Sequence, residues 1–264
     1  KRSEKERAMD EIAKWLNIPR SIMASSDLSA ILNQGLIPTL SHPVRALSAL
    51  KQMGKSMASE GEFNRWFQEV QDSPRWELIT KKMGVRLTDP FSPFLEAREE
   101  AFGAGYAERI PFIGTNIIKG SERAYVQYLN KHRWDMANDL INRWEDDGKT
   151  LKNSKRLYEF TGKFINDITG SGNLPFKLEQ YAGFFNGLMF SPRLMVSRMR
   201  LLSLYYLWGG PKELRGQYLK ELGRSLTTVA SVVGAFYVKG LMMSDDDPDK
   251  ISVELDARSS DFFK

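Results

Sequence analysis

The sequence predicts an all-α protein of roughly nine to eleven helices, with one short β element beginning near its C-terminal end. Three observations lead to this fold class. Apolar residues recur every three or four positions through most of the chain, as they do along one face of a helix. Glycine and proline divide these segments from one another. Residues 251–255, ISVEL, alternate instead with the period of a strand.

The first half of the chain contains short helical segments with recognisable ends. Pro38 and Pro43 are expected to bracket a break, and Pro43 then occupies the first turn of a helix, where proline is tolerated. Ser59 and Glu62 form a capping box, and Gly84 is expected to end a later helix. The expected helices cover residues 3–16, 27–34, 43–57, a segment after Ser59 with its apolar face at Phe63, Trp66, Phe67 and Val70, then 74–83 and 95–107.

The second half carries the longest periodic segments. Residues 120–144 form the strongest predicted helix, which Gly148 ends. A helix at 154–169 turns its apolar residues inward and is followed by a flexible turn at 170–173. The remaining expected helices are 178–189, one that Ser191 and Pro192 begin and residues 209–211 stop, and 212–243, broken or bent near Gly234 and Gly240.

The chain divides into three parts on this pattern. Residues 1–18 are expected to be a helix or linker from an upstream region, and residues 19–244 a helical domain. Residues 245–264 contain an acidic loop and the start of the β element. Because the chain begins at Lys1 without methionine and stops at Lys264 in what looks like the middle of an element, we expect a segment of a longer polypeptide.

Composition limits the classes of protein. Hydrophobic residues make up 42% of the chain, enough for a folded core. The formal net charge of +5 permits contact with DNA, RNA or an anionic membrane without requiring it. The chain has no cysteine, which excludes disulfides, thiolate zinc sites and cysteine nucleophiles, and its two histidines exclude a multi-histidine metal centre. We therefore expect no cofactor, no metal and no small-molecule substrate.

Candidate catalytic groups each have a simpler structural explanation. His132 lies on the apolar face of the strongest predicted helix, so a core histidine is favoured over a base oriented by Asp135 or Asp139. Neighbouring carboxylates such as Glu96 with Glu99 can run acid–base chemistry on sugars, but they are also common on solvated helix faces. We predict no catalytic residue in this segment.

The stretch FFNGLMFSPRLMVSRMRLLSLYYLW, residues 184–208, combines large apolar groups with three arginines. Such a helix can pack its apolar side into a core and present arginines to acidic partners or phosphates. It could also lie in a membrane interface, and Arg193 could instead form a buried pair with Glu99, Glu122 or Glu179. The candidate contacts for a partner or for phosphate are Arg193, Arg198, Arg200, Arg215 and Lys220.

Residues 226–243 form the longest nearly uncharged segment, interrupted only by Lys239. A membrane-spanning helix needs about 20 apolar residues, so this segment is borderline. A buried core helix is the favoured interpretation, and membrane insertion is the main alternative. The candidate membrane contacts are Leu226, Val229, Val232, Val233, Phe236 and Tyr237.

Several sequence segments, in this order, resemble a helical domain of the large polyvalent proteins of tailed bacteriophages and related mobile elements. They are SSDLSAILNQG at 25–35, HPVRALSALKQM at 42–53, EAREEAFGAGYAERIPFIG at 96–114, GSERAYVQYLNKHRWD at 120–135, LPFKLEQYAGFFNGLMFSPRLMVSRMRLL at 174–202 and LDARSSDFFK at 255–264. The last is similar to a strand entry in which proline usually stands where this chain has Ala257. The resemblance covers about residue 19 to the end.

The resemblance implies a module of an internal virion protein that is ejected with the DNA. Its place would be the virion interior, with delivery to the host envelope or cytoplasm, and its partners other virion proteins or copies of itself. It carries over no catalytic set. The leading hypothesis is therefore a non-enzymatic structural module acting in particle assembly or genome delivery.

Three other hypotheses stay open. The first is a membrane-active module that contributes to an envelope-spanning channel during DNA ejection. The second is a DNA-binding accessory module, which should show a steep dependence of affinity on salt. The third is an enzyme, for example one that acts on peptidoglycan through a carboxylate such as Glu99 or Glu122.

Overall fold

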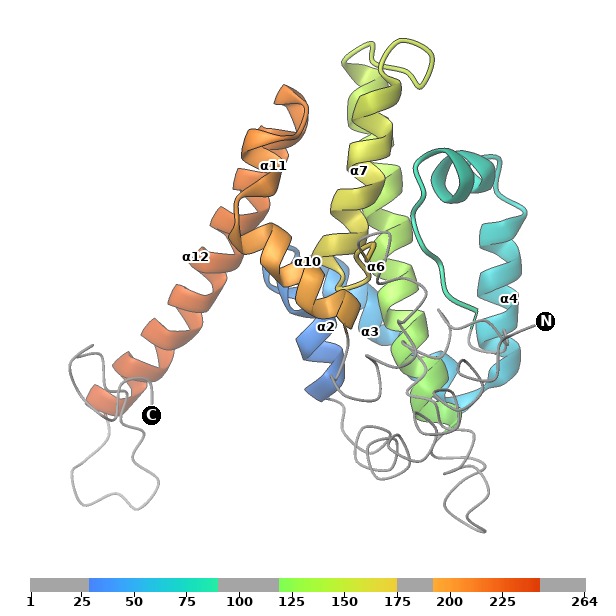
Figure 1. Ribbon diagram of the computed structural model, residues 1–264. Helices are drawn as coiled ribbons and strands as arrows, with labels where there is room; N and C mark the ends of the chain where they lie inside the picture. Colours follow the sequence, from blue (N-terminus) through green and yellow to red (C-terminus); the bar gives the residue numbers. More distant parts are fainter. Residues whose placement is uncertain (1–28, 90–118, 175–191, 243–264) are drawn as a thin grey trace, which may run out of the picture.

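The computed structural model describes residues 29–89, 119–174 and 192–242 (Figure 1). The regular structure of these residues is helical, with no strand among them, which confirms the all-α class for this part of the chain. The strand expected at 251–255 and the helices expected at 3–16, 95–107 and 178–189 lie outside the described residues. The terminal parts 1–18 and 245–264 lie outside them as well.

The helices follow one another in a simple order along the described chain. Their bounds are α2 Ser29–Ser41, α3 Pro43–Ala58, α4 Glu60–Gln71, the π-helical turn η1 Leu78–Lys82, α6 Lys119–Asp146, α7 Lys155–Ile168, α10 Pro192–Leu202, α11 Tyr205–Trp208 and α12 Lys212–Met242.

Helix α6 is the centre of the fold, with α3, α2, α4 and α7 packed around it (Figure 1). Its N-terminal half contributes Tyr128 and Leu129 to a core shared with α3 and α4. Its C-terminal half contributes Ile141 and Trp144 to a larger core shared with η1, α7 and α10–α12. The period of three to four residues therefore places apolar side chains on several sides of α6, as expected for a helix surrounded by others.

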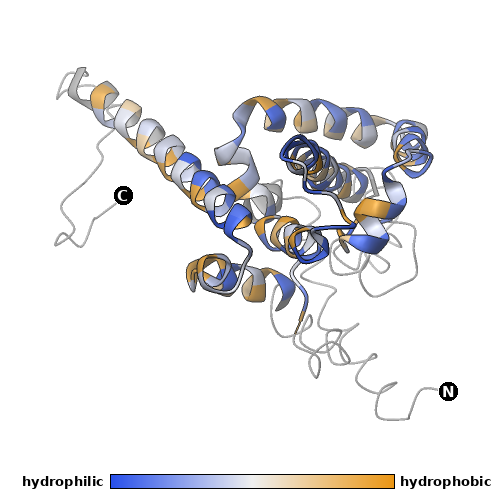
Figure 2. Cartoon of the chain, turned by 90° about the horizontal axis from the view of Figure 1, so that it is seen from above, coloured by the Kyte–Doolittle hydropathy of each residue, from blue (hydrophilic) through white to orange (hydrophobic). Residues whose placement is uncertain are grey.

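Helix α12 packs by its N-terminal half against α2, α11 and α7. Its C-terminal half extends away from the other helices (Figures 1 and 2). The helix continues past Gly234 and Gly240, so the break expected there does not occur. The positions of glycine alone thus overestimated the interruption of this helix.

Most predicted helix ends are confirmed. Pro43 begins α3, and α7 lies between Ser154 and Thr169 as its capping residues. Gly84 and Gly148 adopt φ values of 72° and 71°, the left-handed conformation that glycine allows at a helix end. Two details differ. Ser59 occupies the N-cap of α4 without a side-chain capping hydrogen bond, and the helix expected at 74–83 covers residues 76–82, of which η1 is π-helical.

The break expected at Pro38 is wrong, because α2 continues through this proline to Ser41. A proline inside a helix costs about 3 kcal/mol, since it removes one backbone hydrogen bond and crowds the preceding turn. Contacts with other helices offset this cost. The Thr228 hydroxyl on α12 donates to the carbonyl of Leu40 at 2.7 Å. A Cβ at Gly35 would lie 2.7 Å from the Tyr128 ring, so α2 and α6 approach closely here.

The single helix expected from Pro192 to Trp208 is also corrected. Helix α10 ends at Leu202, and Leu204 adopts a left-handed conformation with φ of 57° before α11 begins. This conformation costs a residue with a side chain about 1–2 kcal/mol. The change of direction lets Tyr206 enter the core, where its hydroxyl donates to Asp167 at 2.5 Å.

Candidate functional site

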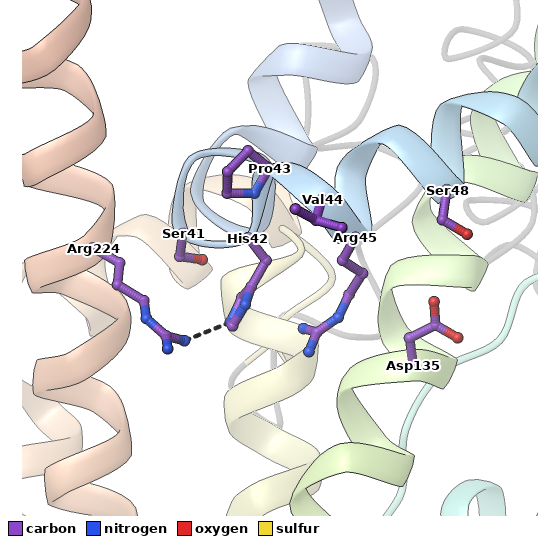
Figure 3. Close-up of a pocket in the computed structure, with 8 residues that line it drawn as sticks. All are labelled: Ser41, His42, Pro43, Val44, Arg45, Ser48, Asp135 and Arg224. Carbon is purple, nitrogen blue, oxygen red and sulfur yellow. Dashed lines mark hydrogen bonds between the residues drawn. The ribbon is translucent and has the colours of Figure 1, made fainter.

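A pocket lies where α2 meets α3, facing α6 and α12 (Figure 3). Its volume is about 530 Å³. The lining residues come from the α2–α3 junction, from α6 and from α12: Ser41, His42, Pro43, Val44, Arg45, Ser48, Asp135 and Arg224. The pocket therefore lies at the junction between the bundle and α12, the helix that projects from it.

His42 connects the junction to α12. Pro43 at the first position of α3 holds the residue before it outside the helix, and the ring of His42 points toward α12 (Figure 3). His42 Nε2 lies 2.9 Å from Glu221 Oε1 and 3.3 Å from Arg224 Nη1. The ring can therefore donate to Glu221 in one tautomer or accept from Arg224 in the other.

Glu221 is buried at the base of this contact. Burial raises the pKa of this carboxyl, but the hydrogen bonds of His42 and Ser41 and the charges of His42 and Arg224 outweigh burial and leave the pKa below its usual value. The amide of Gln217 also donates to Glu221, and Arg143 on α6 donates to Gln217. A chain of polar contacts therefore runs from the α2–α3 junction through α12 to α6.

The other charges around the pocket are paired with neighbours. Arg45 donates to Asp139, and Lys131 contacts Asp135 at 2.5 and 2.7 Å. The positive and negative groups therefore compensate one another across α3, α6 and α12. The contact of Arg45 with Asp139 joins α3 to α6, whereas the pair of Lys131 and Asp135 lies within α6.

His132 lies in the core beside this pocket. Its side chain is buried, and its ring stands edge-on to Tyr128 at a centroid distance of 4.6 Å. Burial, followed by the positive charges of Arg45, His42, Lys131 and Arg133, lowers the pKa of His132 to about 3. The two carboxylates nearby in sequence, Asp135 and Asp139, bind Lys131 and Arg45 instead of His132. The structure thus favours the core interpretation of this histidine.

The five basic residues predicted as partner or phosphate contacts fall into two groups. Arg193, Arg198 and Arg200 lie on α10, and Arg215 and Lys220 lie on α12. Arg193 is buried, and burial lowers the pKa of Arg198. Glu99 and Glu179, two of the carboxylates expected to pair with Arg193, lie outside the described residues, as does the side chain of Glu122.

Arg200 contacts two groups of its own chain. Its Nη1 donates to Asp167 at 3.2 Å, and its Nη2 donates to the carbonyl of Asn173 at 2.5 Å. Arg215 and Lys220 are exposed, with Arg215 Nε also donating to the carbonyl of Gly210. The structure thus does not bring the five side chains together on one exposed face.

Sequence reasoning missed Asp167 as a buried carboxylate. Its side chain accepts from Tyr206 and Arg200, and burial, the largest effect, raises its pKa despite these bonds. The available signal was its place three residues after Phe164, on the inward face of α7. Asp167 ties α7 to α10 and α11.

The segment predicted as core or membrane helix is exposed where it is described. Leu226 is 68% exposed to solvent, and Val229 and Tyr237 are exposed as well. Val233 is half-buried, and the side chains of Val232 and Phe236 lie outside the description. The core interpretation is therefore wrong for Leu226, Val229 and Tyr237, because this half of α12 extends from the bundle and leaves them exposed (Figure 1).

No described helix combines the length and the apolar character that crossing a membrane requires. No three His, Asp or Glu side chains within the described ranges gather closely enough to hold a metal ion.

Comparison with protein-family models, with curated proteins and with solved structures finds no match to this chain.

Proposed function

We propose that this chain is a non-enzymatic structural and interaction module. Following the sequence resemblance, we place it in a large internal virion protein of a tailed bacteriophage, where it acts in particle assembly or genome delivery. Its partners would be other virion proteins or other copies of itself.

The exposed apolar face of α12 is the observation that carries this proposal. A soluble chain seldom leaves a contiguous apolar face in water unless a partner covers it. Here the face lies on a helix that extends from the bundle, which makes it accessible to a partner (Figure 2). The polar groups at the base of the helix, Glu221 and Gln217, are meanwhile engaged in holding it to α2 and α6.

Peptide mapping by mass spectrometry of purified particles from the source element tests the virion assignment. We expect peptides of this region in stoichiometric amounts relative to known structural proteins of the particle. Their absence from the particle, together with their presence in infected cells, would contradict the assignment.

A membrane-active module is the second candidate, because Leu226, Val229 and Tyr237 could also meet lipid. Flotation of the protein with anionic liposomes distinguishes the two. Binding that persists in high salt and is lost in Leu226→Glu supports contact with lipid, whereas binding that salt abolishes indicates surface electrostatics alone.

A further inference from the structure

Helix α12 has two apolar faces on opposite sides. The face toward the bundle contains Leu214 and Tyr218, which are buried against it. The opposite face follows positions separated alternately by four and three residues, which form one straight stripe on a helix. This outer stripe consists of Leu219, Gly223, Leu226, Ala230, Val233 and Tyr237. It is about 27 Å long at 1.5 Å per residue.

From Leu226 onward the outer stripe lies on an uncharged part of the helix. No charged residue occurs between Leu226 and Val238 on any side of α12. A partner bearing Asp, Glu, Lys or Arg at this surface would lose the hydration of those groups and receive no opposite charge in return. The surface therefore selects an uncharged, apolar partner, and α12 of another copy has this character.

The polar residues beside the outer stripe are already hydrogen-bonded within the chain. The hydroxyl of Thr227 donates to the carbonyl of Gly223 at 2.9 Å, and that of Ser231 donates to the carbonyl of Thr227 at 2.8 Å. These side chains can therefore be covered without leaving an unsatisfied donor. Covering this part of the helix costs little in lost hydrogen bonds to water.

Large and small residues alternate along the outer stripe. When two copies of α12 lie antiparallel, with a two-fold axis midway between Leu226 and Ala230, each large residue near the axis faces a small one. In this register Leu226 lies opposite the partner's Ala230, Val233 opposite the partner's Gly223, and Leu219 opposite the partner's Tyr237. Arg224 turns away from the stripe toward His42, and Lys220 is exposed and can keep its ammonium in water. Both stand level with the partner's Val232 and Phe236, so like charges do not meet.

We propose that the outer stripe of α12 binds α12 of a second copy of this chain, antiparallel and across a two-fold axis between Leu226 and Ala230. One surface then serves both subunits, as in most homodimers. Each bundle lies on the side of its own α12 away from the contact, so the two bundles do not compete for the same space. This inference rests on the proposed function, since it names a copy of the chain as the partner.

Analytical ultracentrifugation of the chain tests the dimer. We expect a dimer that Leu226→Glu and Ala230→Glu each weaken by about a hundredfold, because a carboxylate would be buried without a partner. Leu47→Glu is the matched control, since Leu47 is equally exposed at 69% but lies on α3. It should leave the dimer unchanged, and circular dichroism should show that all three variants remain helical.

Cross-linking tests the orientation, because the natural chain has no cysteine. In the antiparallel register, an equimolar mixture of Leu219→Cys and Tyr237→Cys chains should form mixed disulfide dimers on mild oxidation. Either variant alone should not, since its two thiols would lie about 27 Å apart. Efficient linking of Leu219→Cys to itself would overturn the antiparallel register.

Other results would overturn the dimer itself. These are a wild-type monomer at high concentration, a monomer that floats with liposomes, or a monomer that Leu226→Glu unfolds because another segment of the same chain covers the stripe. A monomer whose peptides are nevertheless stoichiometric in the particle would end this inference and leave the proposed function standing. A chain that dimerises but is absent from the particle would contradict the proposed function and leave the dimer standing.

Discussion

The two halves of α12 invert the usual relation between polarity and burial. In the N-terminal half, Gln217 and Glu221 are buried and hydrogen-bonded to α6 and to the α2–α3 junction. In the C-terminal half, Leu226 and Tyr237 are apolar and exposed. The comparison teaches that polar contacts, together with Leu214 and Tyr218, attach the N-terminal half to its own bundle, whereas the apolar residues of the C-terminal half remain available to something outside.

The largest effect should come from removing Glu221, the buried acid in the N-terminal half of α12. Glu221→Ala leaves His42 and Gln217 without their common acceptor and removes the negative charge near Arg224, and breaking a buried ion pair costs about 3–5 kcal/mol. We expect the free energy of unfolding in urea to fall by about 3 kcal/mol. Glu221→Gln, which keeps an acceptor but not the charge, should lose less, and equal losses in the two variants would contradict the role of the charge.

Acid should lower the stability of the helix bundle against which α12 packs, through His132 on α6. The folded-state pKa of His132 is lowered to about 3 from an unfolded value near 6.5, so the unfolded chain binds the proton more readily. The stability linked to His132 is therefore complete above pH 6.5 and is lost as the pH falls toward 3.

Between pH 7 and pH 5 this linkage removes about 2 kcal/mol of unfolding free energy. Urea denaturation at the two pH values measures it in the wild type. His132→Phe keeps a ring against Tyr128 but cannot titrate, so its loss over the same interval should be smaller by about 2 kcal/mol. The same loss in both proteins would show that other groups cause the acid sensitivity.

A smaller effect is expected at the turn that leads into α12. Tyr206→Phe removes the hydroxyl that donates to buried Asp167 and keeps the ring in the core. The unfolding free energy should fall by about 1–2 kcal/mol, the typical cost of leaving a buried acceptor with one bond fewer. Tyr205→Phe is the control, because Tyr205 is partly exposed, and its effect should be negligible.

The smallest effect should come from a substitution in the C-terminal half of α12, which extends from the bundle. Leu226→Ala removes an exposed side chain, so the unfolding free energy of the monomer should change by at most about 0.5 kcal/mol. Denaturation at a protein concentration low enough to keep the chain monomeric measures this value. A loss above about 2 kcal/mol would mean that Leu226 is covered within its own chain.

The sequence predicted the elements of the fold better than their environment. Helices α6 and α7 were predicted almost to their ends, because long periodic patterns and capping residues such as Gly148 and Ser154 are local signals. Pro38 misled the prediction, since contacts of α2 with α6 and α12 hold the helix through it. Leu204 gave no warning of its left-handed turn, which lets Tyr206, two residues later, enter the core and bind Asp167, 39 residues earlier in the sequence.

The candidate site shows the same limit. Periodicity identified 226–243 as an apolar helix but could not tell which side faced the bundle, because apolar residues occur around most of its circumference. The arginines of α10 were recognised, but not that Arg200 would bind Asp167, two residues that are distant in sequence. Contacts of this kind depend on how helices are placed relative to one another, which no local pattern contains.

The sequence by itself determined that the described part of this chain is helical, where α6 and α7 begin and end, and that α12 is long and nearly uncharged beyond Arg224. Only the tertiary structure decided that His42, Glu221 and Gln217 attach α12 to the bundle and that the outer stripe faces away from it. The physical reason is that secondary structure follows from hydrogen bonds and conformational preferences of side chains within a few residues of one another. Burial, in contrast, depends on which surfaces the whole chain can cover.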